Sequence, residues 1–181
     1  MRVIRSERNR GKGNAVKVGM TNARGRAVLM TDADLSTPIE ELDKLLPHLR
    51  DGTEVVIGSR KMAGAVIEVR QPLLREMMGR VFTQLTRLFV VRVSDVTCGF
   101  KLFSRQAAHD VFSRVTLDDW SFDAEALFVA RRLGYGIREV PVLWRDAAGT
   151  KVHRGRDAVR AAVGLLRIIA NSARGRYGFR R

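Results

Sequence analysis

Three observations predict an α/β fold built on a mostly parallel sheet flanked by helices. The chain has 181 residues, of which 45% are hydrophobic, and this is enough for one folded domain with its own core. Short apolar runs of strand length alternate with longer amphipathic stretches of helical period. The two clearest strands, 27–30 and 54–57, consist mostly of apolar residues, as expected where helices cover both faces of a parallel sheet.

The remaining elements follow from the same periodicities in chain order. Thr37 is a suitable N-cap, and Pro38 a suitable first residue, for the helix that follows the first strand. Residues 95–103 are expected to form a turn and a short strand, and residues 137–144 a closing strand. The expected helices are residues 15–23, 38–49, 73–91, 106–112, 123–133 and 157–170.

Charge and cysteine content restrict the class of protein. The net charge is +14, and residues 151–181 alone carry nine Lys/Arg and one acid, so an anionic partner is expected. A single cysteine, Cys98, excludes an internal disulfide framework and fits a reducing compartment. No apolar run reaches membrane-spanning length and residues 1–10 do not resemble a signal peptide, so we expect a cytoplasmic protein that touches a membrane from one side.

The strongest candidate site is the pair Asp32 and Asp34, directly after the strand at 27–30. In parallel α/β sheets, ligands bind beyond the carboxyl ends of the strands. Two carboxylates there suit a hard divalent cation such as Mg²⁺ or Mn²⁺, which neutralises a departing diphosphate, and Ser36 offers a third oxygen. The alternative is a surface loop whose acids only cap the next helix.

Further polar residues are weaker candidates. Arg10 and Lys12, in a glycine-punctuated basic turn, can cradle phosphate, although a solvated basic turn is the alternative. Asp95 is either a turn cap or a group that steers or deprotonates an attacking oxygen. Asp123 and Glu125 compete for that role or only cap their helix.

The distribution of arginines suggests contact with an anionic membrane. The helix at 73–91 carries several arginines and one acid, Glu76, and the helix at 157–170 continues into a basic tail. We therefore divide the chain into a catalytic part, 1–150, and a membrane-associating part, 151–181. Nucleic acid is the competing partner, but it is not expected because aromatic residues are only 7% of the chain.

Together the motifs resemble the family 2 glycosyltransferases that act on polyprenyl phosphates, especially the dolichyl-phosphate β-glucosyltransferase type. The matching stretches occur in family order between about residues 5 and 170. They are Asn-Arg-Gly-Lys-Gly (9–13), Thr-Asp-Ala-Asp-Leu-Ser-Thr-Pro (31–38), Val-Val-Ile-Gly-Ser-Arg (55–60), Arg-Gln-Pro-Leu (70–73), 95–103, 120–127 and Glu-Val-Pro-Val (139–142) with Trp144.

The resemblance implies a GT-A-like fold, a UDP-glucose donor, a polyprenyl or dolichyl phosphate acceptor, and inversion at the anomeric carbon. By match, the metal would bind Asp32 and Asp34 with Ser36 near them, and Asp95 would act on the acceptor side with Asp123 and Glu125 nearby. The donor diphosphate would meet Arg10, Lys12, Asp32, Asp34 and Arg60. The acceptor phosphate would meet Arg70, Arg75 and Lys151.

One departure from the family pattern concerns the N-terminal side. Family members begin with two nucleoside-binding strands that this sequence does not show, and these would lie beside 27–30. We therefore expect an open strand edge there. A non-catalytic fragment, and a basic nucleic-acid-binding module, remain the alternatives to an enzyme, and a homo-oligomer is compatible with the sequence.

Overall fold

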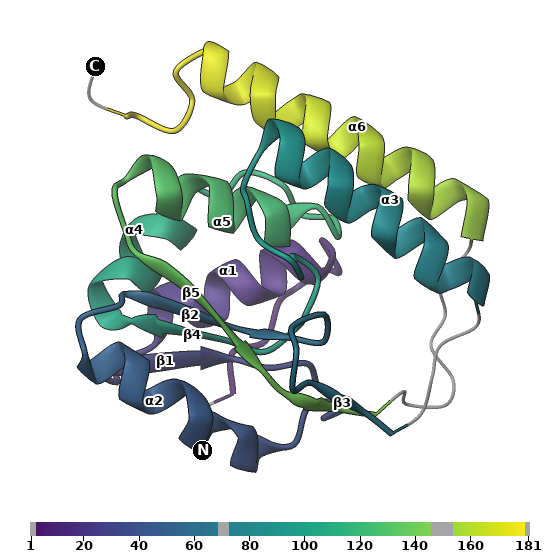
Figure 1. Cartoon of the computed structure of the whole chain (residues 1–181). Helices are drawn as coiled ribbons and strands as arrows, with labels where there is room; N and C mark the ends of the chain where they lie inside the picture. The colour runs from purple at the N-terminus through teal and green to yellow at the C-terminus, as the bar shows by residue number, and fades with distance from the viewer. Residues whose placement is uncertain (1–2, 69–72, 146–153, 180–181) are drawn as a thin grey trace.

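The computed structural model describes residues 3–68, 73–145 and 154–179, and Figure 1 shows a central sheet covered by helices. The first part of the chain forms α1 (Lys12–Asn22), β1 (Ala27–Met30), a short 3₁₀ helix (Ile39–Glu41), α2 (Leu42–Arg50), β2 (Val55–Ser59) and β3 (Val66–Ile67). The second part forms α3 (Leu73–Phe89), β4 (Lys101–Ser104), α4 (Arg105–Arg114), α5 (Phe122–Arg132), β5 (Ile137–Pro141), β6 (Leu143–Trp144) and α6 (Arg154–Ala173).

The main sheet has the strand order β1-β4-β2-β5. Strands β1, β2 and β5 run in one direction, whereas β4 runs opposite to both of its neighbours, β1 and β2. The mostly parallel sheet is therefore confirmed in strand direction, but only β2 and β5 are directly paired in parallel. The reversed strand comes from residues 101–104, which the sequence predicts as a strand but whose direction it does not indicate. Within the described residues β1 is an edge strand, as expected.

Helices cover both faces of this sheet (Figure 1). On one face α2 places Leu45 against Val56 and Leu102. On the other face α1, α4 and α5 form a larger core with the opposite sides of the same strands, which includes Phe103 and Phe112 at 5.3 Å between ring centroids. Alternate residues of a strand point to opposite faces, which is why Leu102 and Phe103 belong to different clusters.

Helices α3 and α6 pack against each other outside α5 and form the outermost layer on that side. Within the described residues, no helix combines the length and the apolar character that crossing a bilayer requires. The described part of the basic C-terminal segment, 154–179, packs onto the rest of the chain. Asn171 donates a hydrogen bond to Thr116 Oγ1 at 3.0 Å, for example.

The start of the helix after β1 differs from the prediction. Pro38 has extended backbone angles and precedes a 3₁₀ turn, and α2 begins only at Leu42. Thr37 is buried and makes no side-chain capping hydrogen bond, so the predicted N-cap is wrong. A side-chain cap does form at α4, where the Ser104 hydroxyl accepts the backbone N–H of Ala107.

Candidate active site

The carboxyl ends of β1 and β2 and the loop before β4 bring the predicted polar residues to one edge of the sheet. Asp32 and Asp34 follow β1, Arg60 follows β2, and Asp95 lies in the loop that leads into β4. Strand β4 lies between β1 and β2 and runs antiparallel to both. The loop that precedes β4 therefore lies between the carboxyl ends of β1 and β2. The sequence separates these residues by up to 63 positions, and the sheet order brings them together.

Asp32 is held between a lysine and a glycine. Lys12 Nζ lies 2.6 Å from Asp32 Oδ1, and about a third of the Asp32 side chain remains exposed. Gly99 lies against the same carboxylate, because a Cβ built at Gly99 would lie 1.9 Å from Asp32 Oδ2. Glycine is required at position 99 by this close approach and not by its backbone angles.

Lys12 is presented by the basic turn at 9–13. Gly11 has a φ of 104°, and a Cβ at Gly11 or Gly13 would meet the backbone of residues 117 and 118. The Gly13 N–H donates to Asp118 O at 2.9 Å, which fixes the turn against this loop. The Lys12 ammonium lies 4.9 Å from the centroid of the exposed Trp120 ring. Both glycines of the predicted phosphate cradle are therefore used for close packing.

Asp34 and Ser36 form the second half of the loop. Asp34 is exposed, and its Oδ1 accepts the backbone N–H of Ser36 at 3.0 Å. Leu35 adopts a φ of 52°, and is the one non-glycine among the described residues with positive φ. Such a conformation is strained for a branched side chain, and strained backbone tends to occur at functional loops. Ser36 is buried, unlike its acidic neighbour.

The residues of this loop fit a nucleotide-bound divalent cation better than a cation held by protein alone. Among the described residues no group of three or more His, Cys, Asp or Glu side chains gathers in metal-binding geometry. Mg²⁺ and similar ions are commonly held by one or two carboxylates plus phosphates and water. Asp32 and Asp34 supply two carboxylates at a strand end, and Lys12 is the cation that meets Asp32 in this structure.

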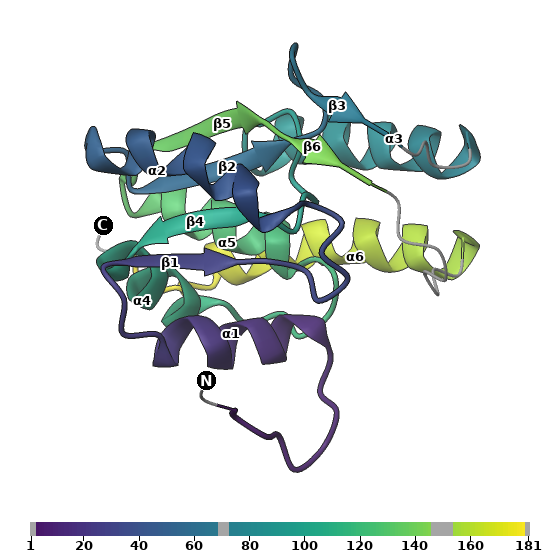
Figure 2. The same cartoon turned by 90° about the horizontal axis from the view of Figure 1, so that it is seen from below.

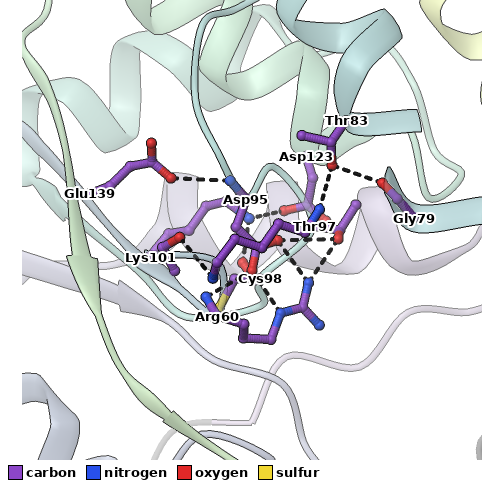
Figure 3. Close-up of polar contacts among 11 residues, drawn as sticks. Arg60, Gly79, Thr83, Asp95, Thr97, Cys98, Lys101, Asp123 and Glu139 are labelled. Carbon is purple, nitrogen blue, oxygen red and sulfur yellow. Dashed lines mark hydrogen bonds and ion pairs between the residues drawn. The ribbon is translucent and has the colours of Figure 1, made fainter. Parts of the chain in front are cut away.

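Asp95 is fully buried and forms a two-pronged ion pair with Arg60 (Figure 3). Arg60 Nε and Nη2 each donate to one Asp95 oxygen at 2.7 Å, and the Arg60 backbone N–H donates as well at 3.0 Å. Burial alone would raise the pKa of Asp95, but the hydrogen bonds and charge of Arg60 outweigh it and lower the pKa to about 2. A carboxylate of this kind is a weak base that does not reach solvent.

Glu139 and Trp144, which were not among the residues predicted for the site, complete the surroundings of this pair. Glu139, on β5, accepts the backbone N–H groups of Ser94 and Asp95 at 2.7 and 3.0 Å (Figure 3). Trp144 lies under the Arg60 guanidinium at 5.3 Å from the ring centroid. Glu139 directly follows Arg138 in the closing strand, so the local pattern does not single it out, and its partners come from a distant loop.

Asp123 pairs with Lys101 inside the protein. Both side chains are almost completely buried, and Lys101 Nζ also donates to the backbone oxygen of Cys98 at 2.5 Å. The pair ties the start of α5 to the loop that carries Asp95 and Gly99. A lone lysine within the apolar strand at 100–103 was the available signal, because a buried ammonium requires a partner.

Glu125 is fully buried and surrounded by donors. Its oxygens accept the backbone N–H groups of Thr116 and Leu117, the Thr116 hydroxyl at 2.5 Å and the Tyr177 hydroxyl at 2.8 Å. The structure therefore does not bring Glu125 to the open edge with Asp32. Its geometry favours a structural role, in which it fixes the loop that in turn packs against the basic turn at 9–13.

The other predicted residues are placed as follows. Arg10 is exposed and pairs with Asp118 at 3.2 Å, so its charge points toward the loop at residues 116–118. Arg75 belongs to α3, but its side chain lies outside the described residues, as do Arg70 and Lys151 entirely. The acceptor-phosphate contacts predicted for these three residues therefore stay predictions.

Comparison with known proteins shows the family to which the chain belongs. The sequence profile described as "Glycosyl transferase family 2" matches residues 1–112, and the chain belongs to this family. The resemblance inferred from the motifs is thereby confirmed.

Several curated relatives carry the name dolichyl-phosphate β-glucosyltransferase. The chain is 37% identical to a dolichyl-phosphate β-glucosyltransferase of Drosophila melanogaster, over 93% of this chain and 57% of the relative. It is 33% identical to the human protein of the same name, over 84% of this chain and 49% of the relative. The chain thus spans about half the length of the curated relatives it matches.

Solved structures confirm the GT-A-like fold. Glucosyl-3-phosphoglycerate synthase from Mycobacterium tuberculosis in complex with UDP superimposes with a TM-score of 0.62 at 20% identity, over 94% of this chain and 56% of the other. Mannosyl-3-phosphoglycerate synthase from Rubrobacter xylanophilus gives 0.61 at 17% identity, over 95% and 54%. A further structure of the mycobacterial enzyme contains Mn²⁺ and UDP-glucose and gives 0.58 at 19% identity, over 94% and 56%.

Proposed function

We propose that this chain is the metal-, diphosphate- and acceptor-side part of an inverting glucosyltransferase that moves glucose from UDP-glucose to a polyprenyl or dolichyl phosphate. The observation that carries the proposal is the loop at the end of β1, where Asp32 pairs with Lys12 at 2.6 Å and Asp34 follows two residues later, at the same edge of the sheet as Arg60. The similarity to dolichyl-phosphate β-glucosyltransferases over more than nine-tenths of the chain supports the substrate class.

In this proposal the protein stabilises the leaving diphosphate and needs no general base. The bond between the anomeric carbon and the UDP oxygen breaks, its electrons pass to the diphosphate, and an acceptor phosphate oxygen bonds to the opposite face of that carbon. A divalent cation held by Asp32 and Asp34 would supply charge neutralisation for the diphosphate. The phosphate acceptor is already an anion at neutral pH, so no proton has to be removed from it.

Asp95 then acts as a positioning residue and not as a base. Its low pKa and complete burial suit a permanent counter-ion that holds the Arg60 guanidinium. Arg60 keeps about a sixth of its side chain exposed and supplies positive charge for the phosphates. Asp123 and Glu125 support the same loops from inside the protein.

The reaction would take place at a membrane, because the proposed acceptor is a lipid. We place the chain peripherally on the cytoplasmic face of that membrane, in agreement with its strong positive charge. A nucleic-acid-binding function gains no support, since most described aromatic side chains are buried or half-buried and do not form a stacking platform.

The test is transfer of radiolabelled glucose from UDP-glucose to polyprenyl phosphate with Mn²⁺ or Mg²⁺. We expect Asp34→Asn to lower the rate by about 100-fold or more, because one of the two proposed metal ligands is lost. Asp43→Asn, at an exposed acid on α2, is the matched control and should leave the rate unchanged. Full activity of Asp34→Asn would refute the metal site, and absence of transfer by the unmodified chain would refute glucosyl transfer by this chain on its own.

A further inference from the structure

Helix α3 carries an apolar stripe on the side that faces away from the protein. Met77, Val81 and Leu88 are 62%, 61% and 74% exposed. Thr83, which accepts a hydrogen bond from Lys61, and Thr86 are buried. Residues three, four or seven positions apart share a helix face, so the three exposed side chains form one stripe opposite the buried one. The helix is therefore apolar where a water-facing helix is normally polar.

Helix α6 also exposes an apolar stripe on its outward side. Leu166 is 66% exposed, with Val163 and Ile169 exposed beside it, whereas Leu165 and Ile168 are buried. The spacing of the exposed residues again places them on one outward face. Two helices that are distant in the sequence thus repeat the same feature.

The two stripes belong to neighbouring helices, since α3 and α6 pack against each other as the outer layer of the molecule (Figure 1). We call this surface, formed by Met77, Val81, Leu85, Leu88, Val163, Leu166 and Ile169, the α3/α6 face. Isolated exposed apolar residues are ordinary, but stripes of them on two adjacent helices indicate an interaction surface.

The charges of the two segments that carry the α3/α6 face favour one kind of partner. Residues 77–92 and 162–179 contain no Asp or Glu. Their charged residues are Arg80, Arg87, Arg92, Arg167, Arg174 and Arg176. A second copy of the same face would bring these like charges together, which disfavours self-association. An anionic bilayer surface accepts both the apolar side chains and the arginines.

We propose that the α3/α6 face docks on an anionic lipid bilayer, with its apolar side chains at the level of the headgroups and the upper acyl chains. Figure 2 shows that α3 and α6 begin on the side toward which β1, β2 and β5 point with their carboxyl ends. Docking through this face would therefore set the edge that bears Asp32 and Arg60 close to the membrane surface. Only this last consequence rests on the proposed lipid-phosphate acceptor.

The test is sedimentation with vesicles of phosphatidylcholine that contain about 30% phosphatidylserine, without UDP-glucose or metal. We expect Val81→Ser/Leu88→Ser/Leu166→Ser to weaken binding by about tenfold or more, because three side chains lose their burial in lipid. The matched control is Ile39→Ser/Val66→Ser, which removes exposed apolar side chains elsewhere. Circular dichroism verifies that each variant is folded.

The arginines are tested separately. Arg87→Gln/Arg174→Gln should weaken binding to the anionic vesicles more than Arg24→Gln/Arg50→Gln, which remove the same charge from other surfaces. Added salt should reduce the difference between the two pairs.

Three results would overturn the docking proposal. They are equal binding by the triple variant and its control, equal binding by the two arginine pairs, and a wild-type dimer that the triple variant dissociates without any loss of vesicle binding. Because the assay contains no substrate, loss of docking with intact glucosyl transfer, or the reverse, separates this proposal from the proposed function.

Discussion

At the scale of single residues, the candidate site is organised by two ion pairs of different character. Lys12 and Asp32 are both partly exposed, so their pair can exchange partners at little cost. Arg60 and Asp95 are joined by two short hydrogen bonds, and Asp95 is completely enclosed. The first pair suits a site that receives a ligand, and the second suits a fixed support.

The exchangeable pair predicts how the chain responds to Mn²⁺ without nucleotide. Lys12→Met should tighten Mn²⁺ binding about threefold or more, because Asp32 loses the ammonium that competes for its oxygens. Isothermal titration calorimetry measures this directly. Lys44→Met is the matched control, since Lys44 also pairs with a carboxylate but on α2. Weaker Mn²⁺ binding in Lys12→Met would contradict the competition.

The fixed pair predicts a pH dependence of stability. The pKa of Asp95 is about 2 in the folded protein and 3.8 ordinarily. The ionised group therefore stabilises the fold above about pH 4, by about 2 kcal/mol, and this contribution is lost as the pH falls through 2. The free energy of unfolding of Asp95→Asn should accordingly lie below that of the wild type at pH 7, and the gap should be roughly halved at pH 3.

Urea unfolding at pH 7, 4 and 3 measures that gap. Asp51→Asn, at an exposed position, controls for the general effect of removing one carboxylate. A gap that stays constant down to pH 3 would show that Arg60 does not depress the titration of Asp95.

At the scale of elements, buried polar contacts connect the C-terminal segment to the site. Tyr177 donates to Glu125, Glu125 fixes residues 116 and 117, and the adjoining Asp118 backbone receives the N–H of Gly13. The loop that presents Lys12 is thus supported by a segment that follows α6. This supporting role explains why Glu125, which the sequence offered as a candidate catalytic residue, is fully buried.

This connection predicts unequal effects for two tyrosines that both donate to a carboxylate. Tyr177→Phe should lower the free energy of unfolding by about 1–3 kcal/mol, because the buried Glu125 loses one of its donors. Tyr135→Phe, whose hydroxyl meets the partly exposed Asp110 at 2.6 Å, should cost less. Urea unfolding of both variants measures the difference, and equal losses would argue against a special role of the buried contact.

At the scale of the whole molecule, the two faces of the sheet are covered by different numbers of helices. Among the described helices, α2 closes one side, and the other side carries a core of three helices with α3 and α6 outside it. Helices α3 and α6 in this outer layer carry both exposed apolar side chains and arginines. Helices α3 and α6 begin on the side of the molecule where β1, β2 and β5 end (Figure 2).

The sequence by itself determined the α/β class, the approximate positions of the four strands of the main sheet but not of β3, and the loop of Asp32 and Asp34, because local periodicity and the polarity change after an apolar strand are short-range signals. It also indicated the family through motif order. Only the tertiary structure decided the reversed direction of β4, the enclosure of Asp95 and Glu125, and the outward apolar faces of α3 and α6. The physical reason is that burial and pairing depend on which distant segments pack together, and a helical pattern shows an apolar stripe without showing whether it faces the core or the solvent.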